Sequence, residues 1–175
     1  MFMSCDLRMN GKYTPKRNSK VNGFTILELI VTLGILAVVL TIAIPNFQWI
    51  SINGNLKTAA RDLIADVNAM KQRAMANNKT YQIVFNVGGN SYTIQEKAGN
   101  PPPADADLPI IKTPSAYGNG ITITSAPFGA GTTIEFQTRG TISQAGSVNL
   151  NNSRNSTATI TCNLSGRNYV QFNMQ

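Results

Sequence analysis

The sequence contains no histidine, only two cysteines and few charged residues. The absence of histidine removes the commonest general base and the commonest transition-metal ligand. A serine or cysteine nucleophile would then need a lysine as its base, and no Ser-x-x-Lys spacing occurs after residue 53. We therefore expect no enzyme activity, no catalytic residues and no bound metal or other cofactor.

The two cysteines are not arranged as the disulfide framework of a small secreted domain. Cys5 lies in a basic N-terminal stretch, whereas Cys162 lies in an alternating run near the C-terminus. If the N-terminal stretch is removed, Cys162 has no partner within the chain. We expect Cys162 to be a small buried hydrophobic residue.

Charge is unevenly distributed along the chain. Residues 1–23 contain five basic residues and one acidic residue, whereas residues 24–175 contain ten basic and seven acidic residues. No charged residue occurs between Leu29 and Leu56. Because much of the formal charge of +7 belongs to one short segment, it is weak evidence for a nucleic-acid partner.

An apolar run from Phe24 to Ile44 follows the basic stretch, and Glu28 is its one charged residue. Its length matches the roughly 20 residues that cross a bilayer as a helix. The run is longer than the core of a secretory signal and no Ala-x-Ala-like site follows it, so we expect it to be retained. The lysines and arginines before the run predict a cytoplasmic N-terminus, with the rest of the chain across the membrane.

Glu28 is unusual because a charged side chain at the centre of a bilayer costs on the order of 3 kcal/mol. Either it lies at the membrane surface and reaches water, or it awaits a positive partner from another chain.

Gly23, followed by Phe24, Glu28 and a long apolar run, resembles the prepilin signature of type IV pilins and type II secretion pseudopilins. The resemblance implies that a prepilin peptidase cleaves between Gly23 and Phe24 and methylates the new amine of Phe24. It also implies that Glu28 pairs with the amine of a neighbouring subunit during filament assembly. Pairing offsets the cost of a buried carboxylate and fixes the register of docking.

The apolar helical pattern continues beyond the membrane run. Six residues recur at spacings of three and four, which predicts a helix with one buried face: Leu56, Ala60, Leu63, Val67, Met70 and Ala74. Pro45 and Gly54 interrupt the run, so we expect kinks or local melting near both.

From residue 80 the pattern alternates, which predicts short strands at 81–85, 91–95, 121–124, 133–136, 147–150, 158–162 and 169–172. Gly88 and Gly89 predict a hairpin turn between the first two strands. The proline-rich segment 99–120 is expected to be a loop, in which Asp105 and Asp107 are solvated rather than bound to calcium. The fold class is therefore α+β, a long N-terminal helix packed on antiparallel sheets.

The second half is similar to minor pilins and pseudopilins of the FimT/FimU and GspH type. The resemblance rests on Met70–Asn77 leading into a strand, on Phe136-x-x-Arg-Gly140, and on a closing hairpin at Ser165-Gly166-Arg167. FimT-like relatives are associated with DNA uptake, which implies DNA as a candidate partner. The candidate contacts are Arg139, Arg154 and Arg167, if their turns meet at one end of a sheet, with Tyr169 stacking on a base. Alternatively, these arginines are scattered surface charges.

We expect three parts: a cleaved leader at 1–23, a membrane and assembly helix at 24–52, and a globular head at 53–175. The predicted function is that of a minor pilin that initiates or caps a type IV pilus, with possible DNA uptake. The alternative is a minor pseudopilin of type II secretion without DNA binding. Other filament subunits, the prepilin peptidase and the inner membrane are the implied partners, with the head in the periplasm before it enters the filament.

Overall fold

The computed structural model describes residues 23–102 and 104–175, apart from the side chains of Pro45 and Asn46. Most of the expected leader, including Cys5, lies outside the described residues. The chain divides into two compact units, one that ends at Thr41 and one that runs from Ile42 to Gln175. Each unit is described by itself.

From Ile26 onward, the first unit is the beginning of helix α1, which spans Ile26–Asn77. Its described side chains are all exposed. The Thr32 hydroxyl donates to the Leu29 carbonyl at 2.9 Å, and the Thr41 hydroxyl donates to the Ala37 carbonyl at 2.8 Å. These hydroxyls are satisfied within the helix itself, as an apolar environment requires.

Helix α1 is continuous through Pro45 and Gly54. The local melting expected at these two residues is therefore wrong. A proline removes one helical hydrogen bond, and a glycine costs about 1 kcal/mol relative to alanine. The flanking helix tolerates both, since from Leu56 onward its apolar face is held by tertiary packing.

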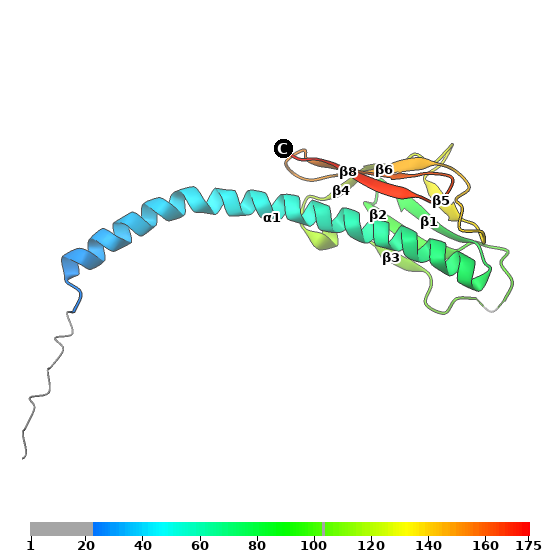
Figure 1. Ribbon diagram of the computed structural model, residues 1–175, viewed down its shortest axis with the longest axis horizontal. Coiled ribbons are helices and arrows are strands. Elements are labelled where there is room, and N and C mark those ends of the chain that lie inside the picture. The colour runs from blue at the N-terminus through cyan, green and yellow to red at the C-terminus, as the bar shows by residue number, and fades with distance from the viewer. Residues whose placement is uncertain (1–22, 103) are drawn as a thin grey trace, which may run out of the picture. The chain divides into compact units, whose positions relative to one another are not determined.

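In the second unit, α1 packs its predicted face against two four-stranded antiparallel sheets (Figure 1). All six residues of the predicted stripe are buried. Cys162 is also buried, as expected, and burial raises the pKa of its thiol to about 11. The predicted α+β fold is confirmed.

The first sheet has the order β3-β2-β1-β5, and the second has the order β4-β6-β7-β8. The strands of the first sheet are β1 (Tyr81–Asn86), β2 (Ser91–Glu96), β3 (Ile110–Lys112) and β5 (Thr133–Phe136). Those of the second are β4 (Thr122–Ser125), β6 (Gly146–Asn151), β7 (Thr157–Cys162) and β8 (Asn168–Asn173). Seven of these strands were predicted close to their observed bounds.

Strand β3 and the following 3-10 helix η1 (Pro114–Tyr117) lie within the segment that was expected to be a loop. Only three residues form β3, which is too short for an alternating pattern to indicate a strand. Its position is fixed by contacts from elsewhere in the chain, because Lys112 bonds to carboxylates of α1.

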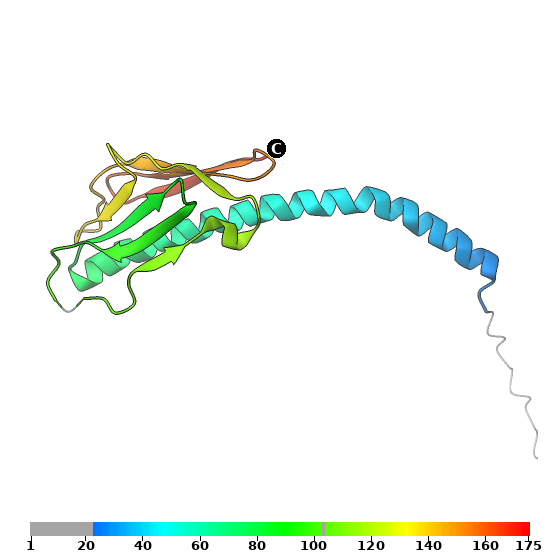
Figure 2. The ribbon, with the colours of Figure 1, turned by 180° about the vertical axis from the view of Figure 1, so that it is seen from behind.

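Strand β3 is one edge of the first sheet and β8 is one edge of the second, and both bond to α1. Figure 2 shows both sheets from behind. The amide of Asn168 in β8 donates to Asn68 of α1 at 3.1 Å. A second link joins the sheets themselves. Asn90, in the β1–β2 turn, donates to the Ile121 carbonyl at 2.9 Å and accepts from the Ile123 amide at 2.8 Å, where β4 begins.

Candidate functional site

The start of α1 carries the residues predicted for processing and assembly. Gly23 and Phe24 precede the helix, and Phe24 is 76% exposed. Glu28 lies in the first turn, where its amide donates to the Thr25 hydroxyl at 3.2 Å. Its carboxylate takes part in none of the ion pairs found among residues 23–102 and 104–175. The geometry leaves Glu28 available to a partner from outside the chain.

The apolar part of α1 is long and hydrophobic enough to cross a membrane. None of its most apolar described residues is buried within the protein. A helix that is apolar on all sides and uncovered requires a lipid or protein environment. The uncovered apolar surface and Glu28 thus lie in the same segment, the beginning of α1.

At the far end of the second unit, two turns that are distant in sequence pack on one another. We call residues 137–141 and 163–167 the paired turns. Both Gly140 and Gly166 have positive φ, at 78° and 72°. A Cβ at Gly166 would overlap the Gly140 carbonyl oxygen, so this contact requires glycine. The Ile142 amide completes the junction by donating to the Leu164 carbonyl at 3.1 Å.

The paired turns carry Arg139 and Arg167, which are both exposed. Lys71 of α1 lies beneath them and donates to the Gly166 carbonyl at 3.0 Å. Arg139 and Arg167 are in no ion pair among the described residues. The paired turns are therefore a basic surface, and Lys71 is a member that the sequence pattern did not reveal.

Arg154 lies at the opposite end of the second sheet. The register pairs Asn151 with Thr157 beside the turn that holds Arg154, whereas Cys162 pairs with Asn168 beside Arg167. Six residues of strand separate these ends, which corresponds to roughly 17 Å. The expectation that the three arginines could form one cluster is wrong for Arg154, since successive hairpin turns of an antiparallel sheet lie at opposite ends.

Tyr169 is the second residue of β8 and pairs with Thr161 of β7. Its side chain is 47% exposed on the outer face of the sheet, two residues after Arg167.

The turn that carries the exposed Arg154 is held by a buried polar junction where the second sheet meets α1. Asn152 donates to the Asn53 side chain at 2.9 Å and accepts from the amides of Arg154 and Ser156, both at 3.0 Å. Asn53, Asn152 and Ser156 are all buried. We call this region the base of the head. Sequence patterns gave no sign of it, because isolated asparagines are common in exposed turns.

The proline-rich segment is tied to the fold rather than solvated. Asp105 accepts a 2.6 Å hydrogen bond from the Tyr81 hydroxyl, and Arg73 lies 3.7 Å from its carboxylate. The expectation of a solvated loop is therefore wrong for Asp105, whereas Asp107 remains 76% exposed. Residues 23–102 and 104–175 contain no cluster of potential metal ligands.

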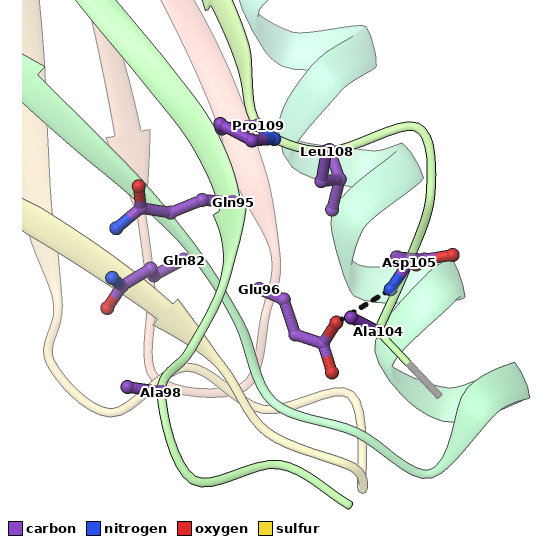
Figure 3. Close-up of a pocket in the computed structure, with 8 residues that line it drawn as sticks. All are labelled: Gln82, Gln95, Glu96, Ala98, Ala104, Asp105, Leu108 and Pro109. Atoms are coloured by element: carbon purple, nitrogen blue, oxygen red, sulfur yellow. Dashed lines mark hydrogen bonds between the residues drawn. The ribbon is translucent and has the colours of Figure 1, made fainter. Parts of the chain in front are cut away.

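A groove of about 310 Å³ lies between this segment and the first sheet (Figure 3). Gln82 and Gln95 line one side, and Glu96 faces Asp105 across it. The Glu96 carboxylate is already engaged, because it accepts from the Asp105 amide at 3.0 Å and lies 2.8 Å from the Lys79 ammonium. These contacts lower the pKa of Glu96, with the Lys79 hydrogen bond as the largest cause. The described residues that line the groove thus include paired structural charges and no nucleophile–base pair.

A charged clamp holds β3 against α1. The Lys112 ammonium lies 3.0 Å from Asp62 and 2.8 Å from Asp66, and the Tyr92 hydroxyl donates to Asp66 at 2.7 Å. Burial alone would raise the pKa of Asp62, but hydrogen bonds from Tyr117 and Lys112 outweigh it, and the net effect is a lowered pKa. Burial and the neighbouring Asp62 raise the pKa of Tyr117 to about 12. The clamp is a structural feature of the head.

Comparisons with known proteins agree with this architecture. The family model for type II transport protein GspH matches residues 59–166, and the prokaryotic N-terminal methylation motif matches residues 18–44. No curated protein matches the sequence at a significant level.

Two solved structures of the minor pseudopilin EpsH from the type II secretion system of Vibrio cholerae share the fold. One has a TM-score of 0.53 at 10% identity and covers 67% of this chain and 97% of its own. The other has a TM-score of 0.52 at 8% identity and covers 69% and 97%. The family model spans more than half of the sequence, and the long helix on antiparallel sheets is the pseudopilin fold. The chain therefore belongs to the GspH family, among the type IV pilins and pseudopilins.

Proposed function

We propose that the protein is a minor pseudopilin of a type II secretion filament, anchored in the inner membrane with its head in the periplasm. The observation that carries the proposal is a GspH-type head behind an N-terminal methylation motif on one chain. The family consists of structural subunits rather than enzymes. Our sequence analysis favoured a type IV pilus, and both the family match and the structural likeness favour its alternative.

Processing is proposed to occur between Gly23 and Phe24, followed by methylation of the Phe24 amine. Two observations support this. Both residues precede the first helical turn, and Phe24 is exposed, so an enzyme could reach the peptide bond. Mass spectrometry of the membrane-purified protein should find methylated Phe24 at the N-terminus. An attached leader, or a cut after Ile44, would contradict the proposal.

Glu28 is proposed to pair with the amine of a neighbouring subunit. Glu28→Leu removes the cost of burying a carboxylate, so the variant should remain in the membrane and fold normally. It should fail to be incorporated with partner subunits, as measured by cross-linking and co-purification. Normal incorporation of Glu28→Leu would show that the pairing is unnecessary here.

Deletion of the gene in its native host distinguishes the two filament systems. Loss of exported enzymes from the medium with surface pili intact supports type II secretion. Loss of pili with secretion intact would assign the subunit to a pilus instead. Complementation by the wild type but not by Glu28→Leu ties either phenotype to filament assembly.

A second proposal concerns DNA, and one observation favours it. The turns that carry Arg139 and Arg167 pack on one another beside Lys71, and Tyr169 follows on the adjoining strand. Arginine suits phosphate contacts, and a tyrosine can stack on an exposed base. Two phosphate contacts would give weak binding with a log–log salt slope of about −2.

Titration of labelled DNA with the detergent-solubilised protein tests this proposal. Arg139→Glu and Arg167→Glu should each abolish binding at low salt without changing the melting temperature. Arg154→Glu makes the same charge change at the opposite end and should have no effect. Equal losses in all three variants, or no binding by the wild type, would remove DNA as a partner.

A further inference from the structure

The stretch of α1 just before the head is apolar and uncovered within the second unit. Phe47, Trp49 and Ile50 are 69%, 41% and 62% exposed. Burial begins one turn later, at Asn53, which is 6% exposed. Three large apolar side chains thus lie immediately below the base of the head, and Trp49 is the only tryptophan in the chain.

The length of the uncharged segment exceeds the thickness of a bilayer's apolar core. Leu29 to Leu56 contains no charged residue, and its 28 residues rise about 42 Å as a helix. The hydrocarbon core of a membrane is about 30 Å thick. If the apolar run beginning at Phe24 fills that core, residues 45–52 fall in the headgroup layer. Tryptophan is enriched in this layer, because its ring is apolar and its N–H can still reach a polar partner.

The positive charges at the base of the head suit the headgroup layer of the membrane. Arg154 is exposed, and its turn is joined to Asn53 through Asn152. Lys57 lies one helical turn beyond Asn53. Neither Arg154 nor Lys57 is in an ion pair among the described residues. The base therefore carries two cations outside any ion pair among the described residues, and Trp49 lies one helical turn before Asn53. Cations that follow exposed aromatic side chains along a helix match lipid phosphates above acyl chains.

We propose that the base of the head is a lipid-headgroup site: Trp49 and Phe47 lie in the interfacial layer and Arg154 binds lipid phosphate. The site holds the head at a fixed height above the bilayer before the subunit enters the filament. The proposal rests on membrane anchoring by the apolar run, but not on the choice between secretion and pilus systems. It gives Arg154 a role distinct from that of the arginines in the paired turns.

The single tryptophan makes the depth measurable in the intact protein. The full chain is reconstituted into phosphatidylcholine vesicles that carry bromine either near the headgroup or near the bilayer centre. Trp49 fluorescence should be quenched strongly by the shallow bromines and weakly by the deep ones. Water-like emission without quenching, or stronger quenching from the centre, would overturn the proposal. Release of the protein by alkaline carbonate would overturn the anchoring itself, which separates the two failures.

The phosphate contact is tested by adding anionic phosphatidylglycerol to the vesicles. Shallow quenching of wild-type Trp49 should increase, and salt should reverse the increase. Arg154→Glu should lose this increase, whereas Arg139→Glu, the same charge change at the paired turns, should retain it. Equal losses in both variants would indicate general charge attraction and overturn the assignment of Arg154. Matching thermal melts of the two variants exclude misfolding as the cause.

Discussion

Glycine at position 166 is required by two separate constraints, a positive φ and the contact with the Gly140 carbonyl. We predict that Gly166→Ala lowers the free energy of unfolding by about 2–4 kcal/mol, since backbone strain and overlap both contribute. Chemical denaturation of the detergent-solubilised protein measures the change.

Alanine substitutions at two other glycines separate the contribution of backbone strain from that of steric overlap. Gly99 has a φ of 92° but open space around its Cβ position, so Gly99→Ala should cost only about 1 kcal/mol. Gly131 has open space and no positive φ, and Gly131→Ala should stay within about 0.5 kcal/mol. Any other order of the three variants would contradict the interpretation of the paired turns.

A substitution of Leu63 tests whether the apolar stripe of α1 belongs to the core. Leu63 is 1% exposed, so Leu63→Ala should lower the free energy of unfolding by about 2–5 kcal/mol through lost burial and a cavity. Leu164→Ala is the matched control, because Leu164 is 56% exposed and should contribute less than about 0.5 kcal/mol. A change below about 0.5 kcal/mol at Leu63 would mean that the stripe is not core.

At the scale of elements, the clamp on β3 makes the head sensitive to acid. The folded pKa of Asp62 lies below its ordinary value of 3.8, so its stabilising effect is present above that value. The effect is lost as the pH falls through the folded pKa, because the unfolded chain binds the proton first. We predict that Asp62→Asn lowers the melting temperature at neutral pH, and that the difference from wild type disappears in strong acid.

Asp107→Asn is the control for this experiment. Its carboxylate is 76% exposed and 3.6 Å from Arg73, an arrangement that contributes little to stability. It should leave the melting temperature unchanged at both pH values. If wild type and Asp62→Asn had the same melting temperature at every pH, the clamp would not stabilise β3.

At the scale of the whole molecule, burial predicts where an independent head begins. Side chains of α1 become buried from Asn53 onward, and the two sheets supply the apolar partner for the helix. A fragment of residues 53–175 should be monomeric, with one cooperative melting transition by calorimetry and circular dichroism. Aggregation or a non-cooperative melt would mean that residues before Asn53 belong to the folding unit.

The elements with strong periodic patterns were predictable from the sequence. The stripe from Leu56 to Ala74 follows from apolar residues spaced by three and four, and seven of the eight strands follow from alternation. A buried face imposes its period on the residues that form it. Strand β3 was missed because Lys112, bonded to Asp62 and Asp66 some 46–50 residues away in sequence, fixes its place. No local pattern encodes such a contact.

The sequence by itself determined the apolar run with Glu28, the family resemblance and the order of helix and strands. These depend on composition and on spacing between near neighbours. Only the tertiary structure decided which basic residues share a surface. Packing of one sheet's turn on the other's brings the turn of Arg139 to that of Arg167, because the Gly140 carbonyl contacts Gly166 and the Ile142 amide donates to the Leu164 carbonyl. Strand register places Arg154 at the other end of the second sheet, beside Asn53.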